Sequence, residues 1–247
     1  MEGWTTAELT EQGRQLRKTT PRSALGTDLD LDRDPISLLD AQNAARVQEL
    51  VPVRWGRMAQ SAFAFYRGTA ALMAHDLATT PVSGLRVQAC GDAHLSNFGL
   101  FASPERTLVF DLNDFDETTL APWEWDVERL VASLAVAARS GGFGADGEWA
   151  VAHAAASAYR TWVAKAASAS ALTVYHKVVT EDLLRSHSAV GETHRGARDQ
   201  EIERAARKAR GRTSERFWFW RYSATSWGIP SRSCAKIPLT AWVSILR

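Results

Sequence analysis

The residues that could do chemistry are concentrated between positions 91 and 128. Asp92 and Asn97 are separated by four residues, and His94 lies between them. This Asp-x-x-x-x-Asn spacing is found in the catalytic loop of phosphotransferases, where the Asp accepts the proton of the attacking hydroxyl and the Asn binds a metal ion. We therefore predict that Asp92 is a catalytic base and that Asn97 is a metal ligand.

A run of acidic residues follows this loop. Seven Asp and Glu residues, and no Lys or Arg, lie between positions 111 and 128. Like charges at close range repel, and a bound cation with a preference for oxygen ligands, such as Mg²⁺, removes that repulsion. Asp111, Asp114 and Asp116 are therefore candidate metal ligands. Strand alternation predicts that Asp114 and Asp116 share one face of the strand and that Asp111 lies on the other. A hydrated hairpin end without metal is the alternative.

Short strands are expected to position these groups. A strand over 85–90 leads into the loop, and a hairpin that pairs 98–101 with 107–113 returns the acidic run to Asn97. Apolar residues at helical spacing between 127 and 134 predict a helix after this hairpin.

Two single residues in this region have alternative interpretations. His94 could order the loop by hydrogen bonding to a carboxylate or a backbone carbonyl, or it could be a general acid or base. Asp126 has the position and residue type of an N-cap for the helix that follows.

A second informative stretch is 51–68, whose partly alternating aromatic residues predict a strand or extended segment. It also contains Arg54, Arg57 and Arg67. Guanidinium groups can hold phosphate oxygens with two hydrogen bonds, so these residues are candidate phosphate ligands. The alternative is that they pair with the carboxylates of 111–128 and stabilise the domain.

The remaining sequence is mainly helical in its pattern. Apolar spacing and caps predict helices over 5–19, with Thr5 or Thr6 as the cap, and over 36–50, 69–78, about 148–168 and much of 175–212.

The composition argues against several kinds of partner and favours one location in the cell. The 247-residue chain has a formal net charge of +1, which gives no reason to expect nucleic acid or an acidic membrane surface as a partner. No apolar run is long enough for a membrane span. Two cysteines and a polar start without an apolar signal segment favour a cytoplasmic protein.

The loop and the acidic run resemble known motifs. Gly91–Asn97 matches the G-D-x-H-x-x-N loop of the aminoglycoside-phosphotransferase branch of the kinase-like superfamily, and Asn113–Asp116 resembles the metal-site motif of that branch. Residues 54–139 resemble more closely a bacterial family called domain of unknown function 2252. The runs that carry this resemblance are RWGRM, FAFYRG, GDAHLSNFG, FDLNDFDE and PWEWDVERL.

The resemblance implies a fold and an activity. The fold is α+β and mainly helical, similar to the catalytic, C-terminal lobe of a protein kinase, with a short β-hairpin that carries the metal site. The activity is transfer of the γ-phosphoryl group of ATP, with Mg²⁺, to a hydroxyl on an unknown small-molecule or protein acceptor. The resemblance assigns Asp92 as base, Asn97 and Asp114 as Mg²⁺ ligands, and His94 and Asp126 as braces of the loop.

The last part of the chain departs from this pattern. Residues 213–247 contain four Trp residues and, after Glu215, no acid. This tail is either a reading-frame change near 215 or a surface that binds a membrane or a partner. We expect an N-terminal helical segment over 1–50, a kinase-like region over 51–212 and this atypical tail.

The resemblance also implies that related chains are longer. They carry a Gly-rich segment and a strand Lys that this sequence lacks, so we expect a shortened form with little or no activity. Two alternatives remain open. One is a catalytically inactive module that binds a metal, or a partner through 51–68. The other is a metal-dependent phosphoesterase that uses water as the nucleophile.

Overall fold

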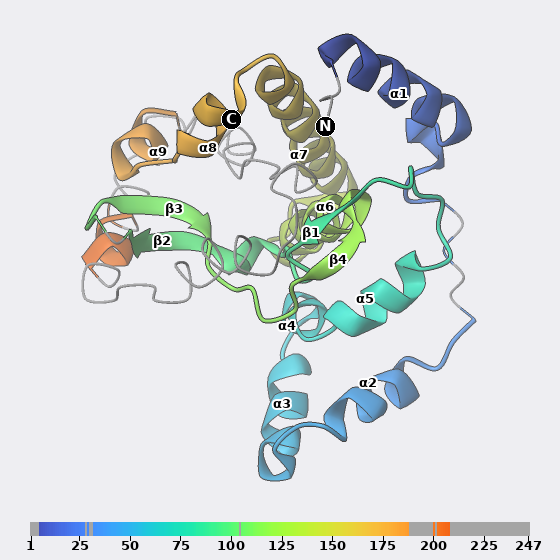
Figure 1. Cartoon of the computed structure of the whole chain (residues 1–247). Coiled ribbons are helices and arrows are strands. Elements are labelled where there is room, and N and C mark those ends of the chain that lie inside the picture. The colour runs from blue at the N-terminus through green and yellow to red at the C-terminus, as the bar shows by residue number, and fades with distance from the viewer. Residues whose placement is uncertain are drawn as a thin grey trace.

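A computed structural model describes residues 5–27, 29, 32–103, 105–187, 200 and 202–207. As predicted, the fold is α+β and mainly helical (Figure 1). The helices are α1 (Thr6–Thr19), α2 (Pro35–Asn43), α3 (Val51–Met58), α4 (Ala62–Arg67), α5 (Ala70–Leu77), α6 (Trp123–Ser140), α7 (Gly144–Ala167), α8 (Ala171–His176) and α9 (Glu181–His187). The strands are β1 (Arg86–Ala89), β2 (Phe98–Ala102), β3 (Leu108–Leu112) and β4 (Thr119–Pro122).

The strands form two small antiparallel sheets. β1 pairs with β4, and β2 pairs with β3 in a register that sets Phe98 opposite Leu112. The second sheet confirms the predicted hairpin of 98–101 with 107–113. Because β3 ends at Leu112, Asp114 and Asp116 lie beyond it, and the prediction that strand alternation sorts the acids between two faces is wrong.

Helices α6 and α7 form the main apolar core. Leu130 and Leu134 of α6 pack against Ala155 and Tyr159 of α7, and all four are buried. The long helix predicted over about 148–168 is thereby confirmed, as is its packing on the helix that follows the hairpin. α6 is also the element that contacts the loop 91–97.

The N-terminal helix forms where its cap predicts. The Thr5 hydroxyl accepts a hydrogen bond from the backbone N–H of Glu8, and the Glu8 carboxylate accepts one from the backbone N–H of Thr5. This reciprocal pair fixes the start of α1. The helix predicted over 36–50 is shorter than expected, since α2 ends at Asn43.

The segment 51–68 is helical, so the prediction of a strand there is wrong. Pro52 lies in the first turn of α3, and the Ser61 hydroxyl caps α4 by accepting a hydrogen bond from the Ala64 N–H at 3.0 Å. On α4, Phe63 and Tyr66 are three residues apart and partly buried, which is a helical spacing. The run of aromatic residues was too short to distinguish the two-residue repeat of a strand from the 3.6-residue repeat of a helix.

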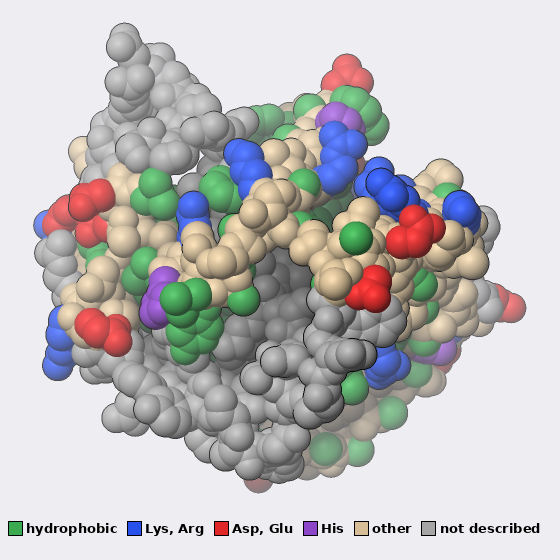
Figure 2. Space-filling view, turned by 45° about the horizontal axis from the view of Figure 1, so that its top comes forward, with side chains coloured by type: hydrophobic (Ala, Val, Ile, Leu, Met, Phe, Trp, Pro, Cys, Tyr) green, Lys and Arg blue, Asp and Glu red, His purple; other side chains and the backbone are tan. Residues whose placement is uncertain are grey.

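Acidic and basic side chains lie on the same face of the molecule (Figure 2). None of the helices that the structure describes is long and apolar enough to cross a membrane. The tail 213–247 and part of the predicted helical stretch 175–212 lie outside the described residues.

Candidate functional site

The loop that starts at Gly91 is held in place by α6. The Asp126 carboxylate accepts hydrogen bonds from the backbone N–H groups of Cys90, at 2.7 Å, and of Gly91, at 3.0 Å. Burial raises the pKa of Asp126, and these two N–H groups oppose the rise. The N-cap prediction is wrong, because α6 begins at Trp123 and its cap position is Pro122. Asp126 does make the kind of contact with the loop that the brace role implied by the resemblance requires.

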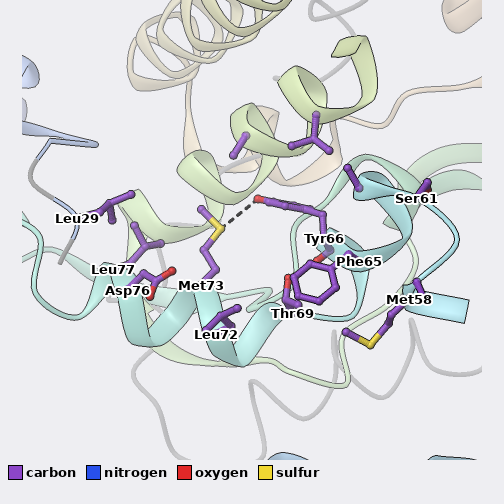
Figure 3. Close-up of a pocket in the computed structure, with 14 residues that line it drawn as sticks. Leu29, Met58, Ser61, Phe65, Tyr66, Thr69, Leu72, Met73, Asp76 and Leu77 are labelled. Atoms are coloured by element: carbon purple, nitrogen blue, oxygen red, sulfur yellow. Dashed lines mark hydrogen bonds between the residues drawn. The ribbon is translucent and has the colours of Figure 1, made fainter. Parts of the chain in front are cut away.

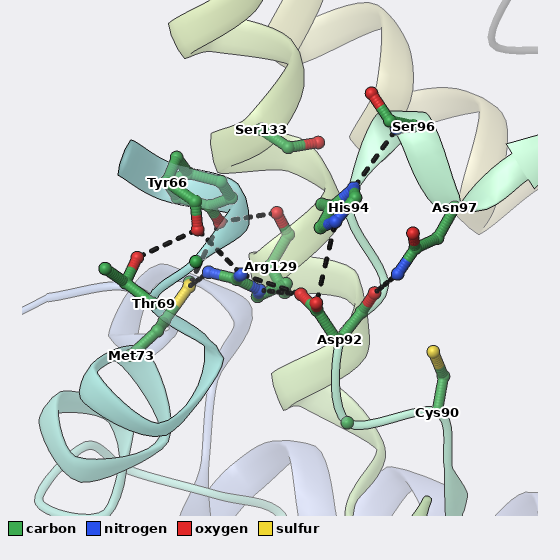
Figure 4. A network of polar contacts seen from close by, with 12 residues as sticks. Tyr66, Thr69, Met73, Cys90, Asp92, His94, Ser96, Asn97, Arg129 and Ser133 are labelled. Atoms are coloured by element: carbon green, nitrogen blue, oxygen red, sulfur yellow. Dashed lines mark hydrogen bonds and ion pairs between the residues drawn. The ribbon is translucent and has the colours of Figure 1, made fainter. Parts of the chain in front are cut away.

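Asp92 forms a buried ion pair (Figure 4). Its side chain is only 11% exposed, and its Oδ1 lies 2.8 Å from Nε and 2.7 Å from Nη2 of Arg129, an α6 residue that is 2% exposed. A buried carboxylate needs such a partner, since an isolated charge is very costly to remove from water.

His94 connects the two ends of the loop. Its Nδ1 accepts a hydrogen bond from the Ser96 N–H at 3.2 Å, and its Nε2 lies 3.5 Å from Asp92 Oδ2. Burial lowers the pKa of His94, and the charge of Asp92 opposes this while those of Arg129 and Arg67 reinforce it. A neutral ring that accepts at Nδ1 carries its proton on Nε2, toward Asp92.

Asn97 joins the loop to the acidic run. Its Nδ2 donates to the backbone carbonyl of Asp92 at 2.8 Å, and its backbone carbonyl accepts from the Asn113 N–H at 2.9 Å. The hairpin therefore returns residue 113 to Asn97. Because Nδ2 is used within the loop, Oδ1 is the atom that Asn97 can offer to a cation.

The predicted carboxylate ligands lie at the end of the hairpin. Asp114 is partly buried, and its Oδ1 accepts from the Asp116 N–H at 3.2 Å. Asp111 faces Gly99 in the register of the hairpin, and its Oδ1 accepts from the N–H of Leu112. The Asp114 carbonyl lies 3.7 Å from the Cys90 sulfur, so the region of Asp114 packs against the start of the loop.

Glu117 is an acid that the sequence did not single out. Its pKa is raised first by burial and then by the charges of Asp92, Asp114 and Asp116. Glu117 is therefore close enough to Asp92, Asp114 and Asp116 for their charges to act on it. The acidic run therefore places negative charge beside the loop 91–97, and a cation is favourable in such a setting.

The donor set fits Mg²⁺ only with help from other ligands. Within the described ranges, no three or more His, Cys, Asp or Glu residues form a group that could hold a metal ion. Magnesium in phosphotransferases is usually held by one or two protein oxygens together with water and substrate phosphates. Asn97 Oδ1 and the Asp114 carboxylate can provide that small set, so these residues fit a nucleotide-bound Mg²⁺ better than a preformed metal cage.

The three predicted phosphate ligands have different environments. Arg54 donates to Asn43 Oδ1 at 2.7 Å, to Gln42 Oε1 at 3.0 Å and to the Gly68 carbonyl at 2.6 Å, and thereby connects α2, α3 and the end of α4. Arg57 and Arg67 are exposed. Arg67 is close enough to the loop for its charge to affect His94.

The sequence prediction also missed Arg129 and its neighbour Tyr66. A signal for Arg129 was present, because Asp126, Arg129 and Ser133 are spaced by three and four residues and so share one helix face. Ser133 contacts the loop as well, since its hydroxyl accepts from the Leu95 N–H at 3.0 Å.

An apolar cavity of about 630 Å³ adjoins this network (Figure 3). Most of its lining comes from residues 58–77, including Met58 and Phe65. Two lining residues, Tyr66 and Met73, also contact Arg129: the Arg129 Cζ lies 4.3 Å from the Tyr66 ring centroid, and Nη1 lies 3.7 Å from the Met73 sulfur. The cavity wall and the carboxylate of Asp92 are thus separated by a single side chain.

These motifs agree with a comparison against protein families. The family model described as "Uncharacterized protein conserved in bacteria (DUF2252)" matches residues 46–226. The chain belongs to this family. The match to DUF2252 includes the whole loop 91–97, the acidic run and α6, and it ends within the predicted tail. No curated protein and no solved structure matches the chain.

Proposed function

We propose that this DUF2252 protein is a kinase-like phosphotransferase that moves the γ-phosphoryl group of ATP to a hydroxyl acceptor. One observation carries the proposal: the loop that holds Asp92 and Asn97 is fixed to the end of the hairpin that holds Asp114. Asn97 bonds to the Asp92 carbonyl on one side and to the Asn113 N–H on the other. Base and metal-ligand candidates are therefore in one unit.

In the proposed reaction Asp92 accepts the proton of the acceptor hydroxyl. The hydroxyl oxygen forms a bond to the γ-phosphorus, and the bond from that phosphorus to the bridging oxygen breaks, with its electron pair left on the β-phosphate. Mg²⁺, when bound, neutralises the charge of the phosphate oxygens. Asn97 and Asp114 would hold it, and His94 and Asp126 keep the loop in place. The exposed Arg67 is the arginine best located to contact a phosphate.

Calorimetric titration with ATP tests this proposal. The chain should bind ATP in the presence of Mg²⁺ and bind it much more weakly without Mg²⁺. The Asp114→Asn variant should lose the part of the ATP affinity that depends on Mg²⁺. Asp146→Asn, an exposed position on α7, makes the same change of charge away from the site and should bind as the unmodified chain does. Absence of Mg²⁺-dependent binding by a folded chain would show that this chain does not form a working nucleotide site and would contradict the proposal for it.

A second candidate is a binding module without catalytic activity. The cavity favours it, because residues 58–66 of the predicted partner-binding stretch 51–68 supply much of the lining. Asp92→Asn separates the candidates. A phosphotransferase should lose turnover with this variant, whereas a binding module should keep its ligand affinity and show no turnover in the unmodified chain either.

A further inference from the structure

Arg129 holds Asp92 in an asymmetric way. Its Nε and Nη2 both contact Oδ1, at 2.8 and 2.7 Å, while Oδ2 faces His94 Nε2 at 3.5 Å. We propose that Arg129 is a positioning residue that fixes the Asp92 carboxylate so that Oδ2 receives the proton of the acceptor. This inference rests on the proposed function, since it says which oxygen of the proposed base, Asp92, receives the proton.

Arg129 is itself held in one orientation by Tyr66. Nη2 of Arg129 donates to the Tyr66 carbonyl at 2.8 Å, and the guanidinium lies over the Tyr66 ring. The Tyr66 hydroxyl donates to the Arg129 carbonyl at 2.6 Å. Burial raises the pKa of Tyr66 to about 12, so this hydroxyl keeps its proton and remains a donor. The two residues therefore hold each other through two hydrogen bonds and a cation–π contact.

Geometry supports a role in positioning more than a role in stability. A buried ion pair often adds little net stability, because the cost of desolvating both charges cancels much of the attraction. It does fix orientation, because the planar guanidinium presents its donors in a fixed arrangement. Lysine in its place would keep the charge but lose the paired donors that select one oxygen of Asp92.

Turnover of ATP with Mg²⁺, with water as the acceptor, tests the inference. Arg129→Lys should lower kcat by about 10- to 100-fold and leave the KM for ATP within about 2-fold, because the base is misplaced and the nucleotide ligands are intact. Tyr66→Phe should lower kcat by a smaller factor. Arg139→Lys is the matched control, since Arg139 is on the same helix and pairs with Glu148 at an exposed site. A kcat for Arg129→Lys equal to that of the control would overturn the inference.

Hydrogen exchange keeps the inference testable if the unmodified chain turns nothing over. That result would count against the proposed function, and the position of the loop could still be measured. Peptides that cover 90–97 should exchange faster in Arg129→Lys than in Arg139→Lys. Equal exchange in the two variants would show that Arg129 does not hold Asp92 and its loop in place. That result would overturn the inference whether or not the chain is catalytically active.

Discussion

Gly91 and Glu117 approach each other so closely that a Cβ atom at residue 91 would overlap the Glu117 carbonyl oxygen. Gly91 also has a φ of 83°, in the left-handed region that favours glycine. The start of the loop 91–97 and the acidic run are in contact at this point, and the contact requires a residue without a side chain.

Gly91→Ala should therefore destabilise the protein strongly. The substitution combines strain at positive φ with overlap against backbone atoms, and we expect it to lower the free energy of unfolding by about 2–4 kcal/mol. Gly142→Ala is the control, because Gly142 has a φ of 77° and a Cβ atom there would meet nothing within 4 Å, so it has the strain alone. Urea denaturation of both variants measures the difference. Equal losses would mean that the close approach to Glu117 does not constrain the loop.

Asp126→Asn should loosen the loop. The carboxylate accepts two backbone hydrogen bonds, and the neutral amide can replace them only in part. We expect a loss of about 1–3 kcal/mol in the free energy of unfolding. Amide exchange at Cys90 and Gly91 should become faster at the same time. Asp146→Asn should change stability by less than about 0.5 kcal/mol. Unchanged exchange at residues 90 and 91 would argue against the brace.

Glu128 should make stability depend on pH. Burial and the charge of Glu124 raise the pKa of Glu128 from 4.5 to about 7, and the backbone of Gly26 opposes this in part. The folded protein therefore holds this proton more tightly than the unfolded chain does. The stabilising contribution is complete below pH 4.5 and is lost as the pH rises through 7. Other acids also titrate in this interval, so the comparison is between variants.

Glu128→Gln isolates this effect. The variant cannot ionise at residue 128, so its stability relative to the unmodified chain should increase between about pH 5 and about pH 8. Urea denaturation at both pH values measures it. Parallel pH profiles for the two proteins would show that Glu128 titrates normally.

Arg54→Ala should reduce stability without a specific effect on nucleotide binding. Its guanidinium makes three hydrogen bonds that link α2, α3 and α4, and their loss should cost about 1–3 kcal/mol. Arg57→Ala removes an exposed Arg from the same helix and should cost much less. Thermal unfolding and ATP titration of both variants distinguish the structural role from phosphate binding. A loss of ATP affinity in folded Arg54→Ala would support the prediction that Arg54 is a phosphate ligand.

The parts of the fold that could be predicted are those specified by local sequence. A polar turn in the sequence separates the two strands of the β2–β3 hairpin, and Thr5 and Glu8 have the residue types and spacing of a helix cap. Both elements were therefore predictable. The stretch 51–68 was not, because its few aromatic residues fit a strand and a helix equally well. Pro52 and Ser61 were the better guides, since both favour the first turn of a helix.

The polar contacts of the site were less predictable than its residues. Asp92 and Arg129 are 37 positions apart, and Tyr66 is 63 positions from Arg129. No local pattern specifies such pairs, because they depend on how α4, α6 and the loop pack together. The spacing of polar residues along α6 indicated a polar face, but the identity of its partners required the structure.

Helix α6 contacts the loop 91–97 at successive turns, through Asp126, Arg129 and Ser133. These contacts fix the position of the loop relative to the helix. Local unfolding of α6 would therefore erase the arrangement of Asp92 in the same event, and the two should open and close as a single cooperative unit. A designer who moved this loop to another scaffold would have to move that face of the helix with it.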